Sequence, residues 1–150
     1  MRRSRHWTDD GGSASLEFIT AGLLLLVPLV FLVLAMSALQ AASLGVEGAA
    51  RQASRVYVQS ESVGEARAAA ARAVEVTLAD YGLDAGDATV TISCRPHPSA
   101  CLTRRGFVTV TVRTTVALPV APPGLELEVP SGIPVTASST EQVSRFAGTR

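Results

Sequence analysis

The chain has 150 residues, which leaves room for one small domain once a membrane-spanning segment is set aside. Its formal net charge is zero, so it lacks the strong overall positive charge by which nucleic-acid-binding proteins are recognised, and we expect no nucleic-acid partner. Aromatic residues make up only 5% of the chain, and this favours a thin layer of helices on a sheet over a large enzyme fold.

The first predicted element is an apolar helix over residues 18–39, which contain no charged side chain. At about 1.5 Å per residue this segment spans roughly 33 Å, enough to cross a hydrocarbon core of about 30 Å. Arg2, Arg3 and Arg5 precede the segment, whereas Arg51 and Arg55 follow it at a greater distance, and this favours a cytoplasmic N-terminus. We therefore predict a single-pass protein of the cytoplasmic membrane with an extracytoplasmic C-terminal domain.

The apolar segment has two alternatives to a membrane span. One is a buried core helix, which is disfavoured because the rest of the chain is too small to surround an apolar helix of this length. The other is a cleaved secretory signal, with a small-x-small site at Ala35-Met36-Ser37. Signal peptides have apolar regions of about 7–15 residues, shorter than this segment.

The border before the apolar segment reads Gly12-Ser13-Ala14-Ser15-Leu16-Glu17-Phe18. This arrangement resembles the processing site of type IV pilin-like proteins, and most closely the TadE-like group of the tight-adherence (Flp pilus) system. The resemblance implies that a prepilin peptidase cuts between Gly12 and Ser13. Glu17 then becomes the fifth residue of the mature chain, followed by Phe18. Pilin leaders usually carry a basic residue near the cut, where this chain has Asp9 and Asp10.

The chemistry of this border is consistent with such a role. Glycine allows an extended chain to enter a protease site without a side-chain clash. Cleavage would create an α-amino group on Ser13, at least partly cationic at neutral pH, one helical turn from Glu17. A carboxylate at the edge of lipid is costly unless it is paired, so Glu17 is predicted to pair with this amine and set the register of neighbouring helices. The alternative is that Glu17 has no pairing role and is simply an acidic residue near a helix N-terminus, where the helix dipole favours it.

The helix is predicted to continue past the membrane to about residue 60. Small residues recur along it every four positions and would allow close packing of another helix; they are Ser37, Ala41, Gly45, Ala49 and Ala53. Alanine-rich sequence also favours helix by itself, and helix propensity alone could account for the stripe. The sequence thus divides into a cytoplasmic leader (1–12), a transmembrane and extended helix (13–60) and an exported helix-plus-sheet domain (61–150).

The exported domain is predicted to begin with an amphipathic helix over residues 61–81, ended by Gly82 as a left-handed cap. Residues 88–94 and 107–118 then alternate apolar and polar side chains, which predicts two antiparallel strands. A weaker strand is predicted over residues 133–138, and the tail after Glu141 is predicted to be frayed. The expected fold class is α+β: a long N-terminal transmembrane helix, a second amphipathic helix and a small antiparallel sheet, as in pilins.

Cys94 and Cys101 flank a short loop outside the membrane, and we predict that they form a disulfide. The alternative is a metal site that adds His97 to the two cysteines, but a fourth ligand is not evident and two prolines stiffen the loop. The strand that follows, Gly106-Phe107-Val108-Thr109-Val110, also resembles the TadE-like group. We expect no resident metal or cofactor.

The sequence contains no catalytic constellation or phosphate-binding loop, so the chain is predicted not to be an enzyme. The resemblance implies a pilin-like protein that helps to assemble a tight-adherence pilus or a related secretion apparatus. Its expected partners are the prepilin peptidase, other pilin-like subunits and the inner-membrane platform of the pilus. The alternatives are an uncleaved, membrane-anchored module that binds an extracellular ligand, and a small metalloenzyme centred on the two cysteines.

Overall fold

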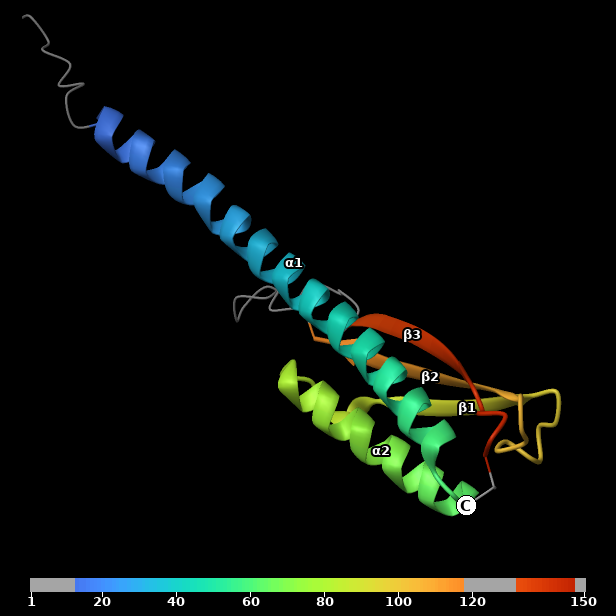
Figure 1. The fold of residues 1–150 in the computed structure, drawn as a ribbon. Helices are drawn as coiled ribbons and strands as arrows, with labels where there is room; N and C mark the ends of the chain where they lie inside the picture. The colour runs from blue at the N-terminus through green and yellow to red at the C-terminus, as the bar shows by residue number, and fades with distance from the viewer. Residues whose placement is uncertain (1–12, 118–131, 148–150) are drawn as a thin grey trace, which may run out of the picture.

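The computed structural model describes residues 13–117 and 132–147. Its longest element is α1 (Ser13–Gln59), a single helix of 47 residues that contains Pro28. At about 1.5 Å per residue, α1 is about 70 Å long. Its N-terminal half extends beyond the rest of the protein, whereas its C-terminal half lies on the domain (Figure 1). One continuous helix therefore joins the apolar segment to the domain.

The second helix, α2 (Val63–Asp80), runs back beside the C-terminal half of α1 (Figure 1). The Ser62 side chain caps its N-terminus by accepting a hydrogen bond from the Glu65 N–H at 3.2 Å. At the other end Gly82 has a φ of 70°, and the Leu83 N–H donates to the Leu78 carbonyl at 3.0 Å. This is the Schellman arrangement that a left-handed glycine permits, and the predicted cap at Gly82 is confirmed.

A short 3₁₀ turn, η1 (Ala85–Asp87), leads into a three-stranded antiparallel sheet in the order β1-β2-β3. Its strands are β1 (Thr89–Arg95), β2 (Phe107–Val116) and β3 (Ile133–Gln142). Val110 of β2 lies between Ile92 of β1 and Ser139 of β3. The predicted α+β layout is confirmed at this level: a long apolar helix, a second helix and a small antiparallel sheet.

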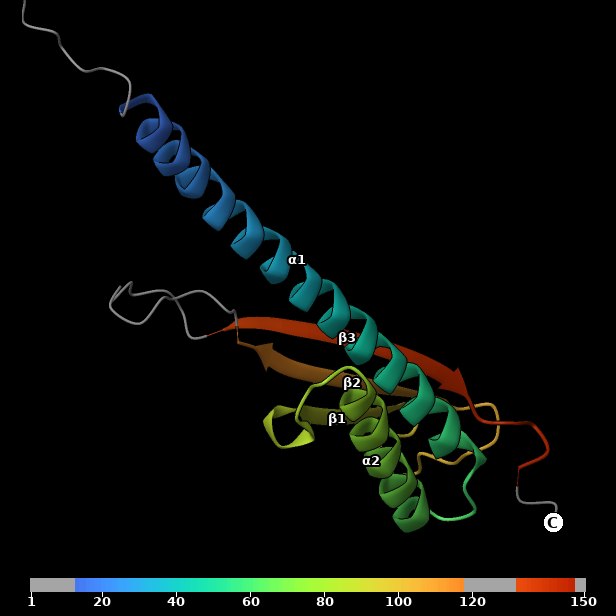
Figure 2. The ribbon, with the colours of Figure 1, turned by 90° about the vertical axis from the view of Figure 1, so that its left-hand side faces the viewer.

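Both helices cover the same face of the sheet, and the opposite face is open (Figure 2). On the covered face, every second residue of β2 from Val108 to Val116 is buried. Helix α2 contributes four buried residues at steps of four: Ala66, Ala70, Val74 and Leu78. Helix α1 contributes its own buried residues, which lie between Ala42 and Tyr57. The core is therefore a thin layer made mostly of alanine and valine, as the composition indicates.

Two details differ from expectation at the end of the chain. Strand β3 reaches Gln142, further than the predicted end near Ser138. The tail is not frayed over its described part, because Val143 is only 1% exposed and exchanges backbone hydrogen bonds with the loop before β2. Val143 N–H donates to the Gly106 carbonyl at 2.8 Å, and Arg105 N–H donates to the Val143 carbonyl at 3.1 Å. These pairings hold the chain in place beyond the strand.

Candidate functional site

The N-terminal half of α1 presents apolar side chains that the rest of the molecule does not cover. Phe18 is 80% exposed, Leu25 is 74% exposed and Leu32 is 61% exposed. Mean hydropathy reaches 2.8 over the most apolar part of the helix, none of which is buried. Exposed apolar surface of this extent marks a protein or membrane contact. By length and composition this helix is suited to cross a membrane, and a signal sequence has the same properties.

The start of α1 carries the predicted processing and register residues. Gly12 lies outside the described residues, and Ser13 is the first residue of α1. Glu17 is exposed and lies one turn after Ser13, and the exposed Phe18 follows it. Because positions four apart in a helix share a face, an amine on Ser13 and the Glu17 carboxylate would be neighbours. The arrangement allows the predicted pairing, and cleavage itself stays a prediction.

The stripe of small residues along α1 divides into two parts. Gly45, Ala49 and Ala53 are buried within the domain, whereas Ser37 is exposed and Ala41 is partly buried. A Cβ atom at Gly45 would lie 3.0 Å from Tyr81 Cβ at the end of α2. The helix that packs closely here is therefore α2 of the same chain. Packing against another subunit at Ser37 and Ala41 stays a prediction.

The two cysteines form the expected disulfide. Cys94 is the buried residue near the end of β1, and its Cα atom lies 5.1 Å from that of Cys101. The bridge uses both sulfur atoms, so neither is free to bind a metal beside His97. A group of three or more side chains placed to hold a metal does not occur within residues 13–117 and 132–147. The bridge fixes the loop between β1 and β2 at the end of the sheet far from the start of α1 (Figure 1).

The loop between β1 and β2 folds back tightly onto the strand ends. A Cβ atom at Gly106 would lie 2.9 Å from the Thr103 carbonyl oxygen, so this position requires glycine. Arg105 has a φ of 59°, a left-handed conformation that is uncommon for a side chain of its size. The Arg104 Nε donates to the Ala147 carbonyl at 2.8 Å. The loop and the chain after β3 thus form one ordered surface.

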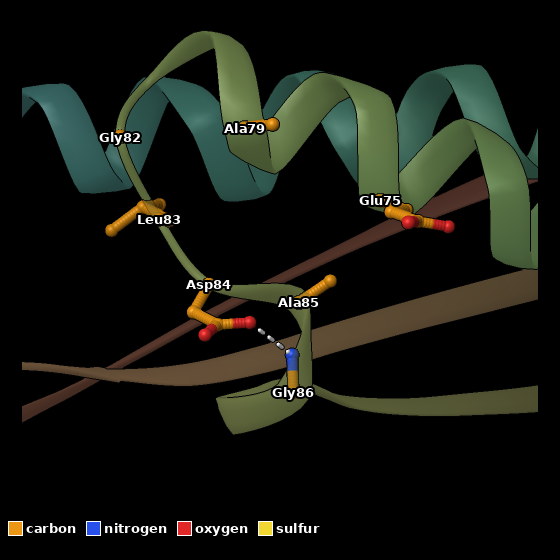
Figure 3. Close-up of a pocket in the computed structure, with 7 residues that line it drawn as sticks. All are labelled: Glu75, Ala79, Gly82, Leu83, Asp84, Ala85 and Gly86. Carbon is orange, nitrogen blue, oxygen red and sulfur yellow. Dashed lines mark hydrogen bonds between the residues drawn. The ribbon is translucent and has the colours of Figure 1, made fainter.

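At the opposite end of the domain, an open pocket of about 710 Å³ lies between α2 and the turn at η1. Figure 3 shows Glu75 on α2 and Asp84 on the turn, on either side of this opening. One Asp84 oxygen accepts a hydrogen bond from the Gly86 N–H at 2.8 Å. The remaining lining residues are Ala79, Gly82, Leu83, Ala85 and Gly86. The pocket is acidic and suits a cationic group.

Two features of the site have no clear signature in the sequence. The acidic pocket forms only when η1 folds back towards α2, and no local motif reports that contact. Tyr57 is fully buried, and its hydroxyl has no hydrogen-bond partner in the part of the chain that the structure describes. The neighbouring residues of α1 are small, and the packed core has room for one large side chain at Tyr57.

Comparison with protein-family models, with curated proteins and with solved structures finds no match to this chain. Functional inference therefore depends on the residues and geometry described above.

Proposed function

We propose that this chain is a pilin-like membrane protein, similar to the TadE-like group, that helps to assemble a tight-adherence (Flp-type) pilus or a related secretion apparatus. The observation that carries the proposal is the division of α1. Its N-terminal half is apolar and uncovered, and its C-terminal half forms part of the core of a small domain. Such a helix can join a bundle of like helices while the domain stays outside the membrane.

Assembly, and not catalysis, is the proposed mechanism. A prepilin peptidase cuts between Gly12 and Ser13 and removes the cytoplasmic leader. The apolar half of α1 stays in the cytoplasmic membrane beside the helices of other pilin-like subunits and the inner-membrane platform. Glu17 lies at the edge of the lipid, where an unpaired carboxylate is costly, and a neighbouring Ser13 amine offsets this cost. That pairing favours one axial position between adjacent helices.

The test is the intact mass and N-terminal sequence of the protein recovered from membranes of its own host. A chain that starts at Ser13 supports the proposal. A chain that starts at Met1 contradicts it and favours an uncleaved, membrane-anchored binding module. A chain that starts near Ala38 indicates a secreted protein and excludes a permanent membrane anchor.

The absence of lysine from the sequence allows a direct test of the pairing at Glu17. All 13 basic residues other than histidine are arginine, so the α-amine of the mature chain would be its only primary amine. A carbodiimide joins an amine to a carboxylate without a spacer. In membranes that contain ¹⁴N- and ¹⁵N-labelled copies, we expect mixed-label cross-links between the Ser13 amine and Glu17. Glu17→Gln should abolish them, and Glu65→Gln, on α2, should leave them unchanged.

A further inference from the structure

Four exposed arginines gather at the end of the domain that lies far from the start of α1. They come from the end of β1, the loop before β2 and the chain after β3; we call Arg95, Arg104, Arg105 and Arg145 the arginine tip. The hydrogen bond from Arg104 to Ala147 and the pairing of Arg105 with Val143 bring these segments together. Three carboxylates, Glu61, Glu65 and Glu141, also lie at this end of the domain. Arg55 and Arg67 lie there too, so arginines outnumber carboxylates at this end.

The other end of the domain is acidic. Glu75, Asp80, Asp84 and Asp87 are all exposed there, around the C-terminus of α2 and η1, and we call them the acidic end. The last turn of α2 contains no basic residue, and Asp80 ends the helix. A helix C-terminus carries partial negative charge, so a carboxylate at this place is unfavourable unless a cation lies near. The arrangement calls for positive charge from outside the domain.

Arg113 lies opposite Thr89 at the start of β1, and Arg72 lies one turn before Glu75 on α2, but the four carboxylates outnumber these two arginines. Within the described residues, the ion pair between Glu47 and Arg51 is the only salt bridge. The arginine tip and the acidic end lie at opposite ends of the sheet, because β1 starts beside Asp87 and ends at Arg95 (Figure 1). A seven-residue strand is about 23 Å long, more than twice the distance of about 8–10 Å over which salt screens charges. The two groups therefore do not neutralise each other.

We propose that the arginine tip of one copy docks on the acidic end of a second copy, so that the domains associate head to tail. The pocket between α2 and η1 can receive an arginine side chain, with Glu75 and Asp84 as its acceptors. Two different surfaces meet in this contact, so each copy leaves one end free for the next. Such a contact repeats into an open chain unless it closes into a ring. The inference rests on the proposed function and extends it, because copies displaced along α1 by about the length of β1 can meet domain to domain.

The tip can be given a single reactive group without a change in charge. Arg105→Lys introduces the only lysine of the chain, and the Arg105 side chain forms no hydrogen bond or salt bridge with the described residues. We expect carbodiimide to join this lysine to Glu75 or Asp84 of another copy of the full-length protein, in detergent solutions that mix ¹⁴N- and ¹⁵N-labelled copies. Arg113→Lys is the matched control, because Arg113 is exposed on the open face of the sheet opposite Thr89, and so lies at the acidic end and not at the tip.

Mixed-label peptides that join position 105 to the acidic end, and their absence for Arg113→Lys, support the head-to-tail contact. Mixed-label peptides that join position 105 to Glu61, Glu65 or Glu141 indicate a tip-to-tip dimer and overturn it. The lack of any mixed-label peptide from position 105 also overturns it, as does equal cross-linking from Arg113→Lys. Processing at Ser13 is read from the same samples. A chain that starts at Ser13 without the head-to-tail cross-link therefore refutes this contact while the proposed function stands.

Charge reversal provides a second test that does not depend on cross-linking chemistry. Arg105→Glu and Glu75→Arg should each lower the association of the full-length protein in detergent about fivefold, in line with a close exposed ion pair. The double variant should recover most of the loss, because the charges are exchanged across the contact. Loss in both single variants without recovery, or no loss in either, contradicts the pairing of these two ends. Unchanged thermal unfolding of each variant shows that the domain itself is intact.

Discussion

Reduction of the disulfide between Cys94 and Cys101 should lower the stability of the domain by an amount that the loop length sets. Cys101 follows Cys94 by seven positions in the sequence. In the chain-entropy model, the loss of this closure at 25 °C lowers the free energy of unfolding by about 2.4 kcal/mol. For a domain of this size, each 1 kcal/mol corresponds to about 4–8 °C in Tm. We therefore expect Tm to fall by about 10–19 °C.

The assay is thermal unfolding of the full-length protein in detergent micelles, with and without a reductant. Near-ultraviolet circular dichroism reports the environment of the buried Tyr57, whereas far-ultraviolet signal from the apolar half of α1 would persist in the micelle. The variant Cys94→Ala/Cys101→Ala is the control, because its Tm should not respond to the reductant. A fall of less than about 3 °C in the wild-type protein would refute the reasoning. It would mean that other contacts, such as the bond from Arg104 to Ala147, already hold this loop closed.

Three further substitutions test local features through the same unfolding measurement. Tyr57→Phe removes a buried hydroxyl that has no partner among the described residues, so stability should stay unchanged or rise by about 1 kcal/mol. A loss of stability above about 1 kcal/mol would show that the hydroxyl has a partner. Ser62→Ala removes the cap of α2 and should cost about 1 kcal/mol, with faster amide exchange in the first turn. Gly45→Val should lower stability by about 1–3 kcal/mol because the new side chain meets Tyr81. Gly64→Ala has open space around it and should raise stability by up to about 1 kcal/mol.

The elements that could be predicted from the sequence are those whose periodicity reports burial directly. Val108, Val110 and Val112 alternate with polar residues, and all three are fully buried in β2. In α2, steps of four place Ala70 and Val74 in the core. These patterns are reliable because each element has one covered face and one exposed face.

The end of strand β3 is harder to predict because its covered face becomes polar after Ala137, at Ser139 and Glu141. Ala137 and Ser139 occupy positions that are valines in β2. The small side chain at Ser139 allows α1 to approach closely, and the Ser54 hydroxyl donates to the Ser139 hydroxyl at 3.0 Å. A position that must be small because a helix packs over it need not be apolar, so the alternation of apolar and polar residues does not reveal it. The same reasoning applies to the alanines of α1, whose packing partner could not be identified from sequence alone.

The candidate site depends on contacts between distant segments. Each arginine of the arginine tip is visible in the sequence, but their gathering requires the register of β1 with β2 and the pairing of Val143 with Gly106. Neither follows from local pattern, since the loop between β1 and β2 has no regular turn signature. The balanced net charge of the whole chain conceals the separation of charge between the two ends of the domain.

Because α1 is one continuous helix, a bend at Pro28 would move the whole domain at its C-terminal end. Proline within a helix removes one backbone hydrogen bond and is the usual site of a bend. The distance along the helix from Pro28 to Tyr57 is about 43 Å. A change of about 20° in the bend at Pro28 would therefore swing the domain through about 15 Å. Small rearrangements among apolar helices would be converted into large displacements of the domain, without any change in the fold of the domain itself.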